Sequence, residues 1–381
     1  MQDIHHYFLS LCAATLCFAL LTLAGCGGGD EEAPPAARYQ ERCRLAQAPD
    51  AAPELPAPMG ANCVGKQHFL LLDATRPEPF TTDETDHRQL HLKVWYPAQA
   101  GGGVRASYMD PLVLPLMKDS MGLPDEAPDV ATNALPGAAL PPAGRYPVIL
   151  FSPGHGMIVE AYTSMLEDLA SHGYVVVGID HPYLSGPTSL AGGEIALTQP
   201  VEPASIGAYM ERAAGTLVAD QRQVLDWLAA QDAASSGSLF SGRLDLSRIG
   251  AYGHSLGGAI SLRTAMADIR VKASIDIDGT MFGDTTGPWT RPLLFVLAAD
   301  HDTDPSIAAV LVHATGPAGM VELPGARHLD FGDLKYLLDR YAPETTAAER
   351  EQMELGSIDA AEAIRFTRER TLAFFEAHVR P

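Results

Sequence analysis

A serine flanked by glycines stands where a predicted strand meets a predicted helix. The segment 253–258 reads Gly-His-Ser-Leu-Gly-Gly, so glycines lie two positions before and after Ser255. An apolar strand pattern (248–252) leads in, and a helical pattern (259–266) leads out. A sharp turn of this kind strains the backbone of the serine, and glycines at those two positions remove Cβ atoms that would clash. The pattern predicts that Ser255 is a nucleophile; the alternative is an ordinary turn with a buried serine.

A serine that attacks an acyl group requires N–H donors for the oxygen that becomes negatively charged. Leu256 begins the predicted helix, where backbone N–H groups are free and the helix dipole is positive. The strand predicted at 147–152 runs into Pro-Gly-His-Gly (153–156), and small residues there let a second N–H approach the reacting carbonyl. We assign the oxyanion hole to the N–H groups of His155 and Leu256. The alternative is a plain glycine turn at 153–156.

The predicted general base is His328. In proteins with this serine turn, the chain order is serine, then acid, then histidine. His328 lies in the segment 324–331, directly after the last predicted strand. His301 and His313 also follow the serine, but His301 ends the preceding strand and His313 falls in a helical pattern. We therefore interpret those two as loop or surface histidines.

Two aspartates compete for the role of the acid that orients the histidine. Asp278 ends the strand that follows the serine turn, and Asp302 ends the next strand. Gly279 allows a tight turn beside Asp278. Asp302 stands between two further aspartates, whose charge disfavours its burial. These observations favour Asp278 and leave Asp302 as the alternative acid.

The rest of the chain alternates strand and helix patterns from about residue 66. Strands that alternate with helices predict an α/β fold with a mostly parallel sheet and helices on both faces. Pro- and Gly-rich insertions at 98–146 and 181–207 are long enough to wall a pocket. We predict eight strands, at 67–72, 90–96, 148–152, 174–179, 248–253, 271–277, 293–297 and 319–323.

The N-terminal segment is typical of an export signal. Residues 7–25 are almost entirely apolar and end in Leu-Ala-Gly before Cys26, which resembles the sequence at which bacterial lipoproteins are acylated. We predict a signal peptide at 1–25, lipidation at Cys26, a tether at 26–63 and a domain at 64–381. The protein would then be an exported, membrane-anchored lipoprotein of the bacterial envelope. The alternatives are an ordinary cleaved signal and a single membrane-spanning helix.

Cys43 and Cys63 remain once the three cysteines at or before Cys26 are set aside. An even pair in an exported chain predicts a disulfide, and the alternative is two free thiols. The formal net charge of −21 over 381 residues repels phosphate backbones, which excludes nucleic acid as a favoured partner. No zinc-binding or phosphate-binding loop motif occurs, so we expect no metal and no cofactor.

Several segments together resemble the platelet-activating-factor acetylhydrolase family of α/β-hydrolases, particularly its bacterial members. The resemblance implies the α/β-hydrolase fold, Asp278 as the acid, and cleavage of short-chain acyl (acetyl-type) esters or phospholipid esters. Residues 293–328 are also similar to bacterial cutinases, which implies a polyester substrate and Asp302 as the acid. A non-catalytic binding lipoprotein on the same fold is the remaining alternative. The segments that carry the first resemblance are 73–80, 94–98, 107–111, 151–156, 178–183, 253–258, 277–282 and 325–331.

Overall fold

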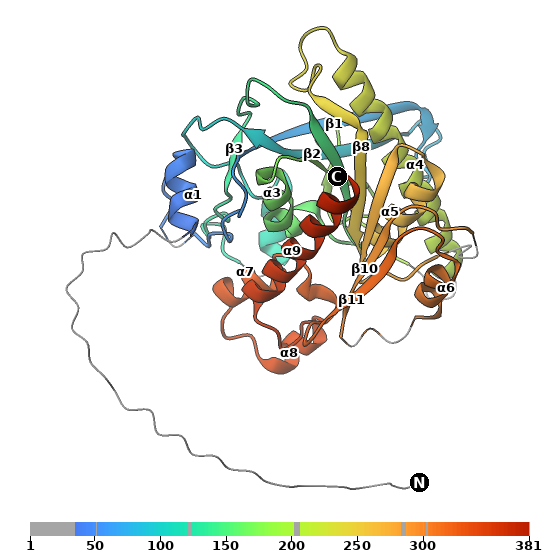
Figure 1. The fold of residues 1–381 in the computed structure, drawn as a ribbon. Coiled ribbons are helices and arrows are strands. Elements are labelled where there is room, and N and C mark those ends of the chain that lie inside the picture. The colour runs from blue at the N-terminus through green and yellow to red at the C-terminus, as the bar shows by residue number, and fades with distance from the viewer. Residues whose placement is uncertain are drawn as a thin grey trace, which may run out of the picture. The chain divides into compact units, whose positions relative to one another are not determined.

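The computed structural model describes residues 35–50, 52–120, 123–201, 206–282, 287–299, 301 and 304–380. Within these residues, one nine-stranded sheet has the order β11-β10-β9-β8-β4-β5-β2-β1-β3 (Figure 1). Only β2 runs antiparallel to its neighbours, β5 and β1. In chain order its strands are β1 (Cys63–Pro77), β2 (His87–Ala98), β3 (Ala134–Pro136), β4 (Tyr146–Ser152), β5 (Val175–Asp180), β8 (Leu244–His254), β9 (Val271–Ile277), β10 (Leu293–Ala298) and β11 (Ala318–Leu323).

The mostly parallel sheet confirms the predicted α/β-hydrolase fold, and each of the eight predicted strands is present. The number eight is wrong, because the short β3 inside the insertion 98–146 pairs with β1 as a ninth strand. A further pair, β6 (Thr188–Ser189) and β7 (Ile195–Ala196), forms a small hairpin. The helices are α1 (Pro35–Cys43), α2 (Leu114–Ser120), η1 (Val159–Tyr162), α3 (Thr163–Ser171), α4 (Ile206–Ala233), α5 (Leu256–Ala267), α6 (Pro305–His313), η3 (His328–Asp330), α7 (Leu334–Tyr341), α8 (Ala347–Gln352) and α9 (Ala360–His378).

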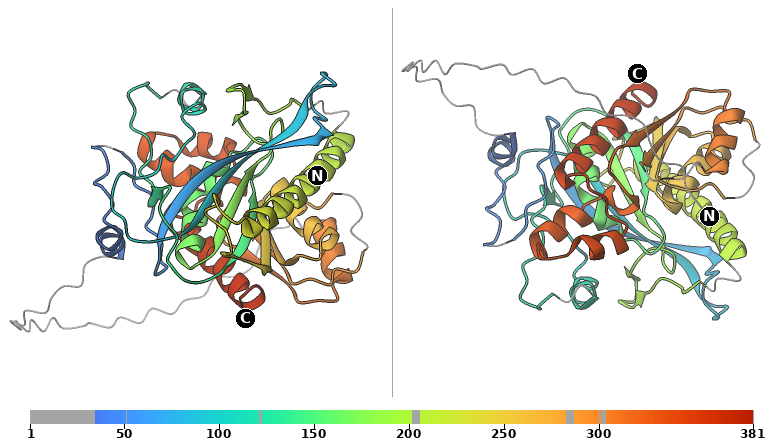
Figure 2. Two further views of the ribbon diagram at one scale, coloured as in Figure 1. Left: turned by 90° about the horizontal axis from the view of Figure 1, so that it is seen from above. Right: turned by 90° about the horizontal axis from the view of Figure 1, so that it is seen from below.

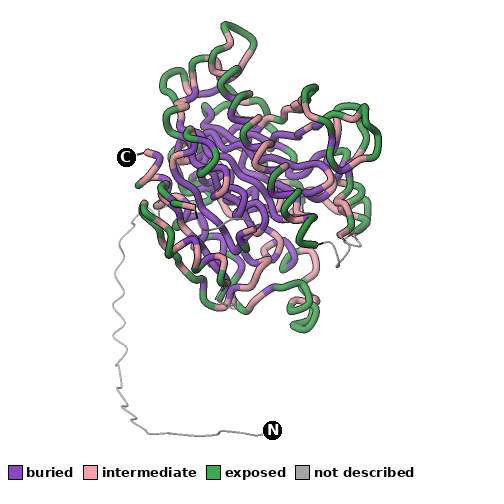
Figure 3. The backbone as a smooth tube through the Cα atoms, turned by 90° about the vertical axis from the view of Figure 1, so that its right-hand side faces the viewer, coloured by how far each residue is buried: buried purple, intermediate pink, exposed green. Residues whose placement is uncertain are grey.

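Helices cover both faces of the sheet (Figure 2). Alternate residues of a strand point to opposite faces, and β4 shows the consequence. Ile149 and Phe151 pack on the face covered by α3 and α9, whereas Val148 and Leu150 pack with α4 on the other face. Because both faces are covered, β5 is buried along its whole length, and β4 and β8 are buried over the residues that lead to the carboxyl edge (Figure 3). A rigid central sheet therefore carries the loops at its carboxyl edge.

The N-terminal boundary differs from the prediction. The compact unit begins at residue 34, well before the predicted domain start at 64. Tyr39 of α1 is buried, and its hydroxyl donates to the carbonyl of Asn133 (3.1 Å). Cys43 and Cys63 form the predicted disulfide, which joins α1 to β1. The described residues between 35 and 62 are therefore part of the folded unit. The buried Tyr39 and the disulfide hold this segment against the rest of the domain.

The predicted signal peptide and Cys26 lie outside the described residues. Within the described part of the chain, no helix combines the length and apolarity needed to cross a membrane.

Candidate active site

Ser255 occupies a strained turn between β8 and α5. Its backbone has φ 55° and ψ −125°, a conformation that residues other than glycine rarely adopt. A Cβ on Gly253 would lie 2.4 Å from the carbonyl carbon of Gly257, and a Cβ on Gly257 would lie 2.0 Å from the carbonyl oxygen of Ser152. Only glycine fits at these two places, so the sequence pattern has the physical cause that was predicted for it.

Asp278 and His328 meet across the carboxyl edge of the sheet. Asp278 directly follows β9, and His328 begins η3 in the loop after β11. The Nδ1 of His328 lies 2.6 Å from Oδ2 of Asp278, whose Oδ1 accepts a bond from the N–H of Ala298 (2.7 Å). Burial alone would raise the pKa of Asp278, but the hydrogen bonds from His328 and Ala298 lower it below its ordinary value. An ionised Asp278 favours the N–H tautomer at Nδ1 of His328, which leaves Nε2 as the basic nitrogen.

The neighbouring aspartates have different environments. Asp276 is fully buried, and burial raises its pKa well above the ordinary value. Its Oδ1 accepts a bond from the N–H of Gly279 (2.9 Å). The alternative acid, Asp302, lies outside the described residues. The residue before it, His301, is the one whose Nδ1 lies 3.0 Å from Oδ1 of Asp278.

The two predicted oxyanion donors border the same cleft as Ser255. Within the described part of the chain, the backbone N–H groups of His155 and Leu256 have no protein acceptor. The side chain of His155 is held by the hydroxyl of Tyr209 on α4, at 2.9 Å from Nε2. Burial lowers the pKa of His155, which keeps this imidazole neutral. The arrangement leaves two N–H donors available to a negative oxygen beside Ser255.

A cleft of about 640 Å³ opens over these groups. The described residues of the insertions at 98–146 and 181–207 contribute none of its lining, so these parts of the insertions do not wall the pocket as predicted. The wall instead comes from the start of α4, the segment after β9, the start of α6 and the loop before α9. Sequence reasoning missed these positions because no local motif marks them. Residues lining the cleft beyond the predicted ones are Met210, Thr280, Phe282, His301, Asp304, Pro305, Arg327 and Glu354.

One group of described side chains outside the cleft has the donors of a metal site. Nitrogen and oxygen atoms of His68, His91 and Asp110 lie within 4.8 Å of one another. The hydroxyl of Ser189 already joins two of them, at 2.5 Å from Asp110 and 2.9 Å from His91. Burial and the charge of Lys93 lower the pKa of His91 to about 4. These contacts explain the group as hydrogen-bonded packing, and we assign no metal to it.

Comparison with protein families shows to which family the chain belongs. Residues 54–192 and 232–380 match the family model described as platelet-activating factor acetylhydrolase, isoform II. The chain belongs to this family. The resemblance that the sequence segments carry is therefore confirmed.

Named relatives of this acetylhydrolase family are esterases. A probable 1-alkyl-2-acetylglycerophosphocholine esterase of Arthroderma benhamiae is 25% identical over 251 residues, 60% of each chain. The platelet-activating factor acetylhydrolase of Gallus gallus is 24% identical over 284 residues, 66% of each chain. The chain thus spans about 60% of the first curated relative. The solved structure of a ferulic acid esterase from Streptomyces cinnamoneus has a TM-score of 0.73 and 30% identity, covering 86% of this chain and 94% of that one.

Proposed function

We propose that the protein is a serine ester hydrolase that cleaves short-chain acyl esters, including phospholipid esters, through an acyl-enzyme. The observation that carries this proposal is the cleft in which Ser255, His328 and the two N–H donors come together, with Asp278 held 2.6 Å from the imidazole. A neutral imidazole beside a serine in a strained turn is the arrangement that activates a hydroxyl as a nucleophile. The names of the relatives support the same reaction class.

In the proposed reaction, Oγ of Ser255 attacks the ester carbonyl carbon while Nε2 of His328 takes the hydroxyl proton. The carbonyl oxygen becomes negative and binds the N–H groups of His155 and Leu256. The C–O bond to the alcohol then breaks, and His328 returns the proton to the departing alkoxide. Water next attacks the acyl-enzyme with His328 as base, which releases a carboxylic acid and regenerates Ser255. Asp278 stabilises the imidazolium in both halves of the reaction.

The cleft walls combine apolar and charged groups. Met210, Leu256 and Phe282 offer apolar contact to an acyl chain, while Arg327 and Glu354 line the same cleft. A mixed wall of this kind suits an ester that carries a small acyl group on a polar alcohol. The ferulic acid esterase similarity makes an aromatic acyl group a specific second substrate class to test. The cutinase-like alternative is a polyester chain with Asp302 as acid.

The test is Ser255→Ala, assayed with p-nitrophenyl esters of increasing acyl length, an oxidised phospholipid, a feruloyl ester and a polyester film. We expect kcat to fall by at least about 10³-fold on every substrate that the wild type cleaves, while the fold is retained. A fluorophosphonate probe should label the wild type at Ser255 and leave the variant unlabelled. Wild-type turnover in a purified Ser255→Ala protein would remove this proposal. A wild type that binds these esters without cleaving them would favour the non-catalytic alternative.

We also propose that the chain is exported and anchored to the envelope by a lipid on Cys26. The apolar segment 7–25 and the residues before Cys26 support this, and so does the Cys43–Cys63 disulfide, since disulfides persist in oxidising compartments. In a bacterial host, Cys26→Ser should abolish labelling by a fatty-acid probe and move the protein from the membrane to the soluble fraction. Unchanged fractionation of the variant would contradict the anchor.

A further inference from the structure

His254, the residue before the nucleophile, contacts the loop that carries the base. It is buried, and its Nε2 lies 2.8 Å from the backbone carbonyl oxygen of His328. A carbonyl oxygen can only accept, so Nε2 of His254 carries the hydrogen. The Nδ1 of the same ring lies 2.8 Å from the hydroxyl of Tyr162. That nitrogen is therefore the acceptor of the Tyr162 O–H.

Tyr162 extends this chain of bonds to a third segment. It ends η1 and is buried, and the backbone N–H of Gly154 is close enough to its hydroxyl to lower the pKa that burial raises. Gly154 lies directly against the serine turn, since a Cβ built on it would be 3.1 Å from Nδ1 of His254. Two hydrogen bonds thus connect η1, the serine turn and the loop of His328, and Gly154 of the loop that carries the oxyanion donor at His155 packs against them.

His328 lies in a short and partly exposed element. His328 is the first of only three residues in the 3-10 helix η3, and 31% of its side chain is exposed. The imidazole rings of His254 and His328 also pack together, with centroids 4.5 Å apart and planes inclined by 41°. The bond from His254 fixes the backbone of His328 from the buried side, while Asp278 fixes its ring at Nδ1.

Burial and the neighbouring His328 favour a neutral His254. Burial, followed by the proximity of His328, lowers the pKa of His254 to about 3. His254 therefore adds no positive charge when His328 becomes an imidazolium during turnover. Apart from Asp278, the titratable groups that share the cleft with His328 are His155, His301, Asp304, Arg327 and Glu354.

We propose that His254 and Tyr162 are positioning residues for the base: together they hold His328 at the distance and angle that proton transfer from Ser255 requires. The inference rests on the proposed ester hydrolase function and adds the means by which three separate loops keep one geometry. Neither side chain needs to touch the substrate. Small displacements of a reacting group cost on the order of 10²-fold in rate, so the anchor should be visible in kcat.

The first test is Tyr162→Phe, with Tyr252→Phe as the matched control. Both tyrosines are buried against Phe151, with ring centroids 4.9 Å and 4.8 Å away, but the hydroxyl of Tyr252 has no partner in the described structure. Without the Tyr162 O–H, His254 can move its hydrogen to Nδ1, which turns a lone pair towards the carbonyl of His328. We expect kcat to fall about tenfold with little change in KM. The control should keep the wild-type kcat.

The pH profile separates positioning from packing. A His328 ring that shifts away from Asp278 loses the charge that stabilises its protonated form, so the acid limb of kcat/KM in Tyr162→Phe should move to lower pH. The limb in Tyr252→Phe should not move. A Tyr162→Phe protein with the wild-type kcat and acid limb would overturn the proposal.

Two substitutions at His254 complete the test. The side-chain amide of His254→Gln can still donate to the carbonyl of His328, whereas His254→Leu cannot, so Gln should retain more kcat than Leu. Equal losses in both, in proportion to their loss of thermal stability and with an unchanged acid limb, would mean a structural role only and would overturn the proposal. Fluorophosphonate labelling of Ser255 is the common reference. A wild type that is neither labelled nor active would instead overturn the ester hydrolase function itself, and the positioning role with it.

Discussion

Backbone strain in this molecule gathers at the cleft. Among the described residues, only five that are not glycine have positive φ, and three of them, Ser255, Asp278 and Glu354, line the cleft. Positive φ costs on the order of 1 kcal/mol or more per residue and persists only where the surrounding structure enforces it. At Ser255 the strain exposes the hydroxyl at a turn, and at Asp278 it turns the carboxylate towards His328. The strain therefore coincides with two of the three residues of the proposed triad.

Asp278→Asn should lower kcat by about 10⁴-fold, because an amide at this position favours the wrong tautomer of His328. The pKa of Asp278 is lower than usual, so its carboxylate stays charged over the pH range in which histidine titrates. The acid limb of kcat/KM therefore belongs to an imidazole, and ionisation of Asp278 adds no step to it. Steady-state kinetics from pH 5 to pH 9 with a p-nitrophenyl ester measure both effects.

The comparison variant is Asp302→Asn, at the alternative acid predicted from sequence. It should change kcat little, and a collapse of activity in this variant alone would move the acid to Asp302 and favour a polyester substrate. Residue types and chain order were sufficient to select Ser255 and His328 as candidates, which the fold brings to one cleft, since the serine turn has a steric signature. They left two aspartates open, because the end of either strand reaches the same edge of the sheet. Only the folded structure shows that Asp278 lies 2.6 Å from His328, because the sequence does not say which strand end faces the histidine loop.

At the scale of elements, long apolar runs were predictable and short edge elements were not. The strands β4 and β5 are almost continuous apolar runs because both faces of the sheet are covered. The three residues of β3 are too few to show an apolar run or an alternating pattern. They form a strand only because β1 lies beside them. The walls of the cleft were mispredicted for a related reason. The length of an insertion does not say on which side of the sheet it packs.

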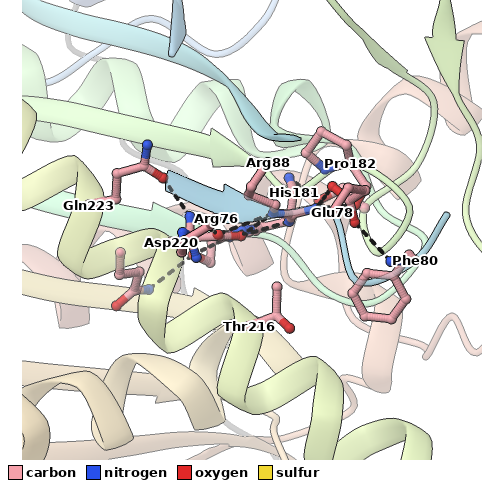
Figure 4. A network of polar contacts seen from close by, with 12 residues as sticks. Arg76, Glu78, Phe80, Arg88, His181, Pro182, Thr216, Asp220 and Gln223 are labelled. Carbon is pink, nitrogen blue, oxygen red and sulfur yellow. Dashed lines mark hydrogen bonds and ion pairs between the residues drawn. The ribbon is translucent and has the colours of Figure 1, made fainter. Parts of the chain in front are cut away.

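Asp220 of α4 is the centre of a buried network of charged side chains (Figure 4). Arg88 donates to both carboxylate oxygens of Asp220, and Arg76 donates at 2.8 Å. His181 lies 2.8 Å from Asp220 and, through its other nitrogen, 3.0 Å from Ser152 at the end of β4. Asp220, Arg88 and His181 are fully buried. The network thus ties α4 and the strands β1 and β2 to the strand that leads into the His155 loop.

Asp220→Asn should lower the free energy of unfolding by about 3 kcal/mol, because it leaves Arg88 buried without its main counter-charge. Despite burial, Arg88 and His181 lower the pKa of Asp220 below its usual range. A lowered pKa stabilises the fold above the pH at which the unfolded carboxyl titrates, about 4, and this contribution is lost in acid. The difference between wild type and variant should therefore be full at pH 7 and shrink below about pH 4. Urea unfolding at several pH values measures it.

The matched control for this network is Glu369→Gln, which breaks an exposed ion pair with Arg365 on α9. Exposed pairs of this spacing contribute less than about 0.5 kcal/mol. If both substitutions had the same small effect, the network around Asp220 would not be the support for β4 that its burial indicates.

At the scale of the whole molecule, the N-terminal segment is fastened to the domain at separate points. The guanidinium of Arg368 on α9 donates to the carbonyl oxygens of Pro56 (2.8 Å) and Ala57 (3.0 Å). The N–H of Gly60 donates to the hydroxyl of Ser171 on α3. Composition alone predicted a tether here, because Ala, Pro and Gly dominate and periodicity is weak. Acceptors on a backbone need no particular side chain, so such a segment can be bound without a sequence signal.

The disulfide adds a covalent link to this segment, and its removal is the last prediction. Cys43 and Cys63 are 20 residues apart, and closing a loop of this length stabilises a fold by about 3 kcal/mol at most through the entropy of the unfolded chain. The double variant Cys43→Ala/Cys63→Ala should unfold at lower urea concentration but keep the wild-type kcat, since neither cysteine lines the cleft. A reductant should destabilise the wild type and have no effect on the double variant, which separates the covalent link from the packing of the sulfur atoms. Two free thiols in the unreduced wild type, found by alkylation and mass spectrometry, would contradict the link. A loss of kcat in the double variant would mean that the anchored segment also supports the cleft, through α3 and α9, to which its backbone is bound.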